Sequence, residues 1–505
     1  MARYKDYSYE QTKLIPVSYH NQILPGTFEN TLSEVIDSID MSLFENRYRN
    51  DATGAKAYDP RILLKIVLYA YSKGIIYSRR IAQLCCDNVV FMALSADTHP
   101  HFTTIADFVS SMQDEIIGIF RHVLQICMEL DLVDGSMFAI DGVKLPSNAS
   151  REWSGTKADL KKKKEKLEQA LKYMVQQHRQ RDTREHEGDE ERKRFNERLE
   201  RAKKKIKKLD DWLGQNDDKV SSRNRTKQSN ITDNESAKMK SSHGVIQGYN
   251  GIAMVDARHQ VIVGAEAFGQ GHDTDLLKPA VEAVKENLKS AGHGNSCLKG
   301  SVVTADTGFH SAESLKYLAE QKIDGYVPDC NFRKRDPRFK TAPRHKEKKT
   351  WSAQTYTNDD FNYFSRGDYF KCPAGQKLLK AKSDLSNNGI TYYKYIAKQK
   401  DCSSCLLRMK CIDHNYPRPR SIFKRSDGGN EFIIKMRKKI DTENGRKIYS
   451  KRMSIVEPVF GNISCSKGMS RFTLRSKRKV NVQWLLYCTV HNIEKIMNFG
   501  YREAA

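Results

Sequence analysis

The sequence predicts an α/β protein: a mixed sheet combined with a helical N-terminal region, an inserted antiparallel helical hairpin and a basic, cysteine-containing insertion. Three observations lead to this prediction. Residues 1–130 carry short apolar stretches with helical spacing, and residues 151–215 repeat apolar positions in steps of four and three. From about residue 245, strand-like runs alternate with helical segments. With 505 residues, the chain is long enough for several domains around a sizeable core.

The N-terminal 130 residues are predicted to form short helices joined by tight turns. Helix starts are expected at Asp59-Pro60, at Ser78 as an N-cap, and at Thr103 or Thr104 as an N-cap. Such helices resemble helix-turn-helix modules that bind DNA. A helical bundle that only packs on the rest of the chain explains the pattern equally well.

Residues 151–215 are predicted to form an antiparallel helical hairpin with a polar loop between Gln176 and Glu190. The apolar repeat in its two halves consists of Leu160, Leu167, Leu171, Met174, Phe195, Leu199, Ala202, Ile206, Leu209 and Leu213. Two lysine-rich runs, at 161–164 and 203–208, either bind phosphates or form the solvated face of the hairpin. The solvated face is the slightly favoured interpretation.

The sheet is predicted from residue 245 onward, with strands at 249–256, 260–266, 301–305 and 324–328 and helices at 273–288 and 312–321. Together with the apolar strand that reaches Asp141, these segments predict a mixed α/β core over 131–328 and 449–505. Residues 329–448 are a long basic insertion before the last helical part of the core.

The charge of the chain favours a polyanionic partner. Lys and Arg number 86 against 62 Asp and Glu, a formal net charge of +24. DNA, RNA and an anionic membrane surface all fit this charge. No apolar run approaches a membrane span and the N-terminus lacks a signal-peptide pattern, so a cytoplasmic protein without a membrane is expected, with its 11 cysteines reduced or metal-bound.

Three carboxylates each follow an apolar stretch and precede a small polar turn: Met137-Phe-Ala-Ile-Asp141-Gly, Val302-Val-Thr-Ala-Asp306-Thr-Gly and Ile455-Val-Glu457-Pro-Val-Phe-Gly461. Taken singly, each acid reads as a turn residue or a helix cap. Their recurrence in an α/β order favours a shared metal site. Mg²⁺ or Mn²⁺ takes such oxygen ligands, and two ions clamp the entering and leaving oxygens of a phosphodiester.

These segments resemble the three acidic blocks of bacterial insertion-sequence DDE transposases. The stretches Asp59-Pro-Arg-Ile-Leu-Leu-Lys and Thr104-Ile-Ala-Asp-Phe108 look like the helical N-terminal domain of the same group. The resemblance implies a ribonuclease-H-like core with Asp141, Asp306 and Glu457 as a triad that binds two Mg²⁺ or Mn²⁺ ions. It also implies a DNA transposase that binds terminal inverted repeats, cleaves the ends of its element and joins the 3′-OH to target DNA, as a dimer or larger synaptic assembly.

Many such transposases carry a Tyr, an Arg, the Glu and a later Lys around the third acid. Tyr449 and Arg452 match the first two, although four residues rather than three separate Arg452 from Glu457. Ser464 takes the place of the expected Lys, and Lys467 is offered as its substitute. Besides Tyr449, the expected DNA-contacting residues are Arg452, Lys467, Arg471, Arg475 and the run 477–479.

Two other functions remain as alternatives to transposition. One is a metal-dependent nuclease of the same core that cuts DNA without joining it. The other is a transposase-derived DNA-binding protein without turnover, against which the presence of all three acids argues.

A second constellation lies in the basic insertion and consists of Cys372, Cys402, Cys405 and Cys411. Four thiolates can close a tetrahedral zinc site and hold together an insertion that has few apolar residues. The wide last gap makes reduced free thiols an equal alternative. Catalytic zinc is not expected, because sulfur would fill all four ligand positions.

Overall fold

The computed structural model describes residues 18–45, 56–182, 189–220, 226–241, 244–292, 297–339, 356–382, 384–387, 390–412 and 418–500. The expected tip of the helical hairpin at 183–188, the first 17 residues of the helical N-terminal region and residues 340–355 of the basic insertion lie outside these ranges. In the described part of the chain, no helix is long and apolar enough to cross a bilayer.

The structure is a mixed α/β fold, as predicted, built on a central sheet with strand order β10-β9-β1-β7-β6 and with β8 also paired to β7. Strand β1 pairs antiparallel with β7 and parallel with β9, and β10 pairs parallel with β9. The strands are β1 (Met137–Pro146), β6 (Ala237–Ser241), β7 (Gly244–Asp256), β8 (Ile262–Phe268), β9 (Val302–Ala305) and β10 (Asp324–Tyr326).

Helices cover both faces of this sheet. On one face, Val284 of α11 (Leu277–Ser290) lies where a side chain at Gly264 of β8 would be. On the other, Trp484 of α19 (Lys477–Phe499) lies against Gly251 of β7. Gly264 shares its face with its pairing partner Met254, and residue 251 points the opposite way, so α11 and α19 lie on opposite faces.

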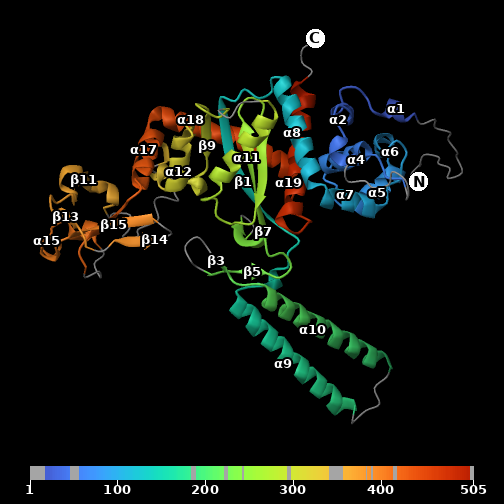
Figure 1. The fold of residues 1–505 in the computed structure, drawn as a ribbon, viewed down its shortest axis with the longest axis horizontal. Helices are drawn as coiled ribbons and strands as arrows, with labels where there is room; N and C mark the ends of the chain where they lie inside the picture. Colours follow the sequence, from blue (N-terminus) through green and yellow to red (C-terminus); the bar gives the residue numbers. More distant parts are fainter. Residues whose placement is uncertain are drawn as a thin grey trace, which may run out of the picture.

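Helix α19 is the centre of the hydrophobic core. Fourteen of its residues are buried, so it is enclosed by protein on all sides, and most of the buried side chains are apolar. It packs on the sheet, on α8 (Gln113–Glu129) and on α4 (Pro60–Ser72), and one continuous cluster joins the N-terminal helices to the sheet. Figure 1 shows α8 and α19 side by side between the sheet and the other N-terminal helices.

The N-terminal region is helical, as predicted, but two of its expected caps are wrong. The helix α5 (Ser78–Asp87) already includes Ser78, and its N-cap Tyr77 makes no side-chain cap bond. The cap of α7 (Phe102–Ser111) is His101, whose ring nitrogen accepts from the backbone N–H of Thr103. The other helices here are α1 (Tyr19–Gln22), α2 (Phe28–Asp37), α3 (Ser42–Glu45) and α6 (Val89–Leu94).

Two long helices, α9 (Lys157–Asp182) and α10 (Asp189–Gln215), lie antiparallel and project from the body of the protein (Figure 1). Only the base of this hairpin is well packed: Leu160, Leu209 and Trp212 are buried there. Short strands border the base: β2 (Ser154–Gly155), β3 (Lys219–Val220), β4 (Thr226–Lys227) and β5 (Ser229–Asn230).

The basic insertion contains a second sheet with strand order β11-β12-β13-β15-β14 and β16 paired to β15. Its strands are β11 (Asn362–Phe364), β12 (Tyr369–Lys371), β13 (Lys377–Lys380), β14 (Leu385–Asn387), β15 (Ile390–Ala397) and β16 (Ser421–Arg425). The buried core of this sheet is small and consists of Phe361, Phe370, Leu378, Tyr395, Ala397 and Ile422.

Six further α-helices lie in the described part of the second half of the chain. Helix α12 (Ala312–Glu320) packs against α17 (Gly429–Asp441), which leads into α18 (Glu443–Gly461). A π-helical turn, Asn462–Ser466, extends α18. The insertion also carries the short helices α13 (Phe332–Arg335), α15 (Gln399–Ser403) and α16 (Arg408–Cys411).

Candidate active site

Two of the three predicted acids lie on neighbouring strands. In the parallel pairing of β1 and β9, Ile140 is opposite Ala305, so Asp141 and Asp306 follow at the same level. Asp141 lies within β1 rather than at its end, because β7 continues to offer pairing partners as far as Pro146. Its partner Ala253 points to the same face as Gly251, which is the face covered by α19.

Arg452 of α18 contacts both of these carboxylates. Its Nη1 donates to Oδ2 of Asp141 at 2.7 Å, and its Nη2 lies 3.6 Å from Oδ1 of Asp306. The other oxygen of Asp141 accepts from the backbone N–H of Gly142 at 2.8 Å. A helix and two strands from distant parts of the sequence therefore converge on one charged cluster.

The charged groups of this cluster shift one another's pKa values. Burial raises the pKa of Asp141, while Arg452 and the Gly142 N–H oppose that rise and Asp306 adds to it. Burial alone would lower the pKa of Arg452, but the neighbouring Asp141 raises it on balance. Arg452 is therefore charged, and it balances two carboxylates that otherwise repel each other.

Glu457, the third predicted acid, does not join the two aspartates in this structure. It lies on α18 and is exposed, and the structure records no hydrogen bond or ion pair for it within the described residues. Five residues of an α-helix turn through about 140° beyond a full turn, so Glu457 and Arg452 point in different directions. Pro458 directly follows Glu457 inside the helix, and the π-helical turn comes four residues later.

Among the described residues, no group of three or more His, Cys, Asp or Glu side chains is arranged to hold a metal ion. The donor chemistry at Asp141 and Asp306 nevertheless suits a hard divalent cation, because two carboxylates already share one cationic group. That cationic group is the guanidinium of Arg452.

Lys467, expected near the DNA, is turned into the protein. Its side chain is 1% exposed and its ammonium pairs with Glu494 of α19, with Asn462 also near. Burial lowers the pKa of Lys467, while Glu494 opposes that change. A DNA phosphate cannot reach this ammonium in the present conformation, so we do not retain Lys467 as a DNA contact.

The remaining predicted DNA contacts lie nearer the surface. Arg471 and Arg475 are exposed, and the backbone N–H of Phe472 between them donates to the carbonyl of Pro146 at the end of β1. Tyr449 packs edge-on against Phe332 with ring centroids 5.3 Å apart, and its ring centroid lies 6.0 Å from the Arg452 guanidinium carbon.

Sequence reasoning missed a polar cluster on the opposite face of the sheet. Lys144 of β1 lies 3.3 Å from Asp273, and Asn250 of β7 donates to the same carboxylate. A side chain at Gly308, two residues after Asp306, would meet Asp273 at 2.7 Å. Asp273 therefore supports the loop that carries Asp306. No local pattern predicts this contact, because the sequence places Asp273 at the start of a helix, whereas that helix, α11, begins at Leu277.

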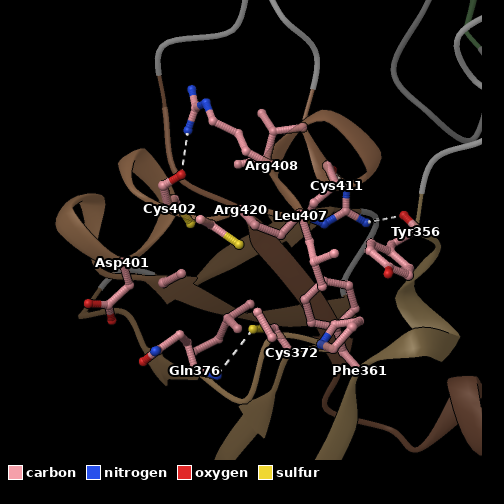
Figure 2. A pocket seen from close by; sticks show the side chains of 16 residues that line it. Tyr356, Phe361, Cys372, Gln376, Asp401, Cys402, Leu407, Arg408, Cys411 and Arg420 are labelled. Atoms are coloured by element: carbon pink, nitrogen blue, oxygen red, sulfur yellow. Dashed lines mark hydrogen bonds between the residues drawn. The ribbon is translucent and has the colours of Figure 1, made fainter.

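The four cysteines of the basic insertion line one pocket between the second sheet and the short helices beside it. Figure 2 shows Cys372, Cys402 and Cys411 around this pocket, with the thiol of Cys372 accepting from the Gln376 N–H at 3.2 Å. Burial raises the pKa of Cys411, and its proximity to the other three thiols raises it further. The four thiols are free, and those of Cys372, Cys402 and Cys405 lie within electrostatic reach of Cys411.

Comparison with known families gives two matches. Residues 371–497 match a transposase DDE domain, and residues 17–111 match a transposase domain (DUF772). The first range contains Arg452, Glu457 and the four cysteines, whereas Asp141 and Asp306 lie between the two ranges. A search of curated proteins found no significant match. The two matched regions, at opposite ends of the chain, indicate an insertion-sequence DDE transposase.

Proposed function

We propose that this protein is a DNA transposase that binds the terminal inverted repeats of its element, cleaves the DNA ends and transfers the 3′-OH to target DNA. The observation that carries this proposal is the convergence of Asp141 and Asp306 on adjacent strands, in a chain that matches transposase families.

The strand order supports a ribonuclease-H-like core for this reaction. Strands β8, β7 and β1 form an antiparallel run, and β9 and β10 continue it in parallel with β1. The core would consist of residues 131–328 and 449–505, with the helical hairpin inserted at 151–215 and the cysteine-containing insertion at 329–448. Residues 1–130 would form the helical DNA-binding domain.

We propose that Asp141, Asp306 and Glu457 hold two Mg²⁺ or Mn²⁺ ions. When bound, the ions would activate the attacking oxygen and stabilise the leaving oxygen of the phosphodiester. Asp141 is held by the Gly142 N–H and Asp306 by the short loop that Asp273 supports. Glu457 must turn toward the aspartates to complete the set, because it is exposed in this structure.

The DNA-contacting surface would include Tyr449, Arg452, Arg471 and Arg475. The two exposed arginines, 471 and 475, lie on the segment that runs along the end of β1, the strand that carries Asp141. One guanidinium group can bind two oxygens of the same phosphate. This segment is therefore suited to bind the phosphate backbone of DNA beside the aspartates. Two element ends must be held together for transposition, so we expect a dimer or larger assembly on DNA.

The test is a cleavage and strand-transfer assay with purified protein, labelled element ends and Mg²⁺. The proposal expects both cut ends and joined products. Cleavage without joining would instead support a metal-dependent nuclease, and binding without either product would support a catalytically silent DNA-binding protein.

We further propose that Cys372, Cys402, Cys405 and Cys411 bind one structural Zn²⁺. The shared pocket and the mutual effect of the thiols on the pKa of Cys411 support this proposal. The side chains of the described residues do not form a closed metal site, so the thiols must reorient about their Cα–Cβ bonds when the ion binds.

A further inference from the structure

Arg452 is unusually enclosed for a residue expected to contact DNA. Its side chain is 11% exposed and lies under the carboxylates of Asp141 and Asp306, which are 28% and 46% exposed. A guanidinium in contact with both acids neutralises the charge that would attract a divalent cation. It also occupies space between the two groups that such a cation would bridge.

We propose that Arg452 is an internal counter-ion that holds the two aspartates in a metal-free state and must leave them before a divalent cation binds. This inference rests on the proposed function, because it assumes that Asp141 and Asp306 are metal ligands. It adds a role for Arg452 that differs from a simple phosphate contact.

The contacts of Arg452 show how it can be released. Its Nη1 makes a short contact with Asp141, but Nη2 is 3.6 Å from Asp306, and its buried Nε has no hydrogen-bond partner among the residues that the structure describes. A buried polar N–H without a partner costs free energy, so the arrangement is not the best available to a guanidinium. A phosphate offers a bidentate partner of comparable strength.

DNA would therefore favour metal binding. A DNA phosphate that draws Arg452 away leaves two carboxylates with excess negative charge, and the affinity for a divalent cation rises. Without DNA, the arginine keeps that affinity low, which would limit hydrolysis before the element ends are in place.

The competing explanation is that Arg452 only orients the aspartates. Under that explanation, removal of the guanidinium lets Asp141 and Asp306 move apart and weakens cation binding. The two explanations therefore predict opposite changes in metal affinity, which makes the difference measurable.

The experiment measures Mn²⁺ binding to the DNA-free, full-length protein by electron paramagnetic resonance. Four proteins are compared with wild type: Arg452→Gln, Arg452→Lys, Asp141→Asn and Lys451→Gln. Lys451 is the exposed neighbour of Arg452 on α18, so its variant removes the same charge without touching the aspartates.

We expect Arg452→Gln to bind Mn²⁺ at least about tenfold more tightly than wild type, because one close positive charge is removed from a partly buried site. Arg452→Lys and Lys451→Gln should stay much closer to wild type, and Asp141→Asn should lose the site. Unchanged or weaker binding by Arg452→Gln, with binding lost in Asp141→Asn, would overturn the counter-ion role alone. Full binding by Asp141→Asn would overturn the proposed metal site itself.

A second measurement needs no variant. Phenylglyoxal modifies accessible arginines, and mass spectrometry reports the extent at Arg452 in the wild-type protein with and without Mn²⁺. We expect Mn²⁺ to increase modification of Arg452 several-fold while modification of exposed Arg471 stays constant. Equal modification of Arg452 in both conditions would contradict its displacement.

Discussion

The guanidinium of Arg452 donates to the carboxylate of Asp141 at 2.7 Å, although 311 residues separate them in the sequence. This contact joins α18, which lies at the end of the cysteine-containing insertion, to the middle of β1, which precedes the helical hairpin. Both large insertions lie between these two residues in the sequence.

The first prediction separates the roles of the three acids. Asp141→Asn and Asp306→Asn should lower Mn²⁺ affinity without DNA and abolish cleavage, because both carboxylates already face one cationic group. Glu457→Gln should leave DNA-free Mn²⁺ affinity close to wild type and still abolish cleavage, because Glu457 is exposed and reaches the site only after a movement.

The matched control for these variants is Asp275→Asn, which neutralises an exposed carboxylate before α11. It should change neither the Mn²⁺ affinity nor the cleavage of DNA. All variants should retain binding to element ends in a gel-shift assay. A Glu457→Gln protein that cleaves normally would remove Glu457 from the proposed triad.

The second prediction concerns Lys467. Lys467→Met should lower the free energy of unfolding by about 3 kcal/mol, because it leaves the partly buried Glu494 without its cation. Its effect on DNA affinity should be small at temperatures where the protein is folded. Lys479 is exposed on the first turn of α19. Lys479→Met should therefore weaken DNA binding and leave the free energy of unfolding almost unchanged. Weaker DNA binding by Lys467→Met at unchanged thermal stability would restore Lys467 as a DNA contact.

The sequence predicted the elements of the core better than the directions of its side chains. The order of strands and helices placed Asp141 and Asp306 near each other, because parallel neighbours bring corresponding ends together. The positions of Arg452, Glu457 and Lys467 depend on how α18 and α19 rotate against the sheet. That rotation is set by contacts such as Phe460 with Trp484, which no local pattern reveals.

The third prediction concerns pH and His491 of α19. One ring nitrogen of His491 lies 2.9 Å from the carbonyl of Gln260 and the other lies 3.0 Å from the Asn462 amide, so the neutral ring satisfies both contacts. Burial lowers the pKa of His491 to about 3. Below pH 6.5 the unfolded chain therefore binds a proton that the folded protein does not, and stability falls as pH falls through this window.

Because of His491 alone, we expect the free energy of unfolding to fall by about 2 kcal/mol between pH 7 and pH 5. Urea titrations at both pH values measure it. The loss should be absent in His491→Gln, whatever the absolute stability of that variant, and unchanged in His99→Gln, which alters an exposed histidine. Equal pH dependence in His491→Gln and wild type would show that another group is responsible.

The fourth prediction is that DNA affinity falls steeply with salt. The formal charge of +24 and the exposed arginines 471 and 475 favour a phosphate-dominated interface. Each phosphate contact should contribute about −0.9 to the slope of log affinity against log salt. The double change Arg471→Gln and Arg475→Gln should therefore make the slope less negative by up to about two units. A slope that does not change would place these residues outside the interface.

The last prediction concerns zinc in the cysteine-containing insertion. Among the described residues of the insertion, the second sheet has a buried core of six side chains, and the four thiols lie together beside it. A metal that joins Cys372 on one side of the pocket to Cys402, Cys405 and Cys411 on the other would cross-link a region with little apolar burial. Elemental analysis should return about one Zn²⁺ per chain, with Zn–S distances of about 2.3 Å by X-ray absorption.

The paired variant Cys402→Ser and Cys405→Ser should lose the zinc and make the insertion more sensitive to proteolysis, while Mn²⁺ binding at the aspartates persists. The matched control is Cys330→Ser with Cys465→Ser, because both thiols are exposed and lie outside the pocket. Metal-free protein whose insertion resists protease as well as the zinc-loaded form would contradict the site. It would identify the four cysteines as reduced thiols, since their shared pocket would then stabilise the insertion through packing alone.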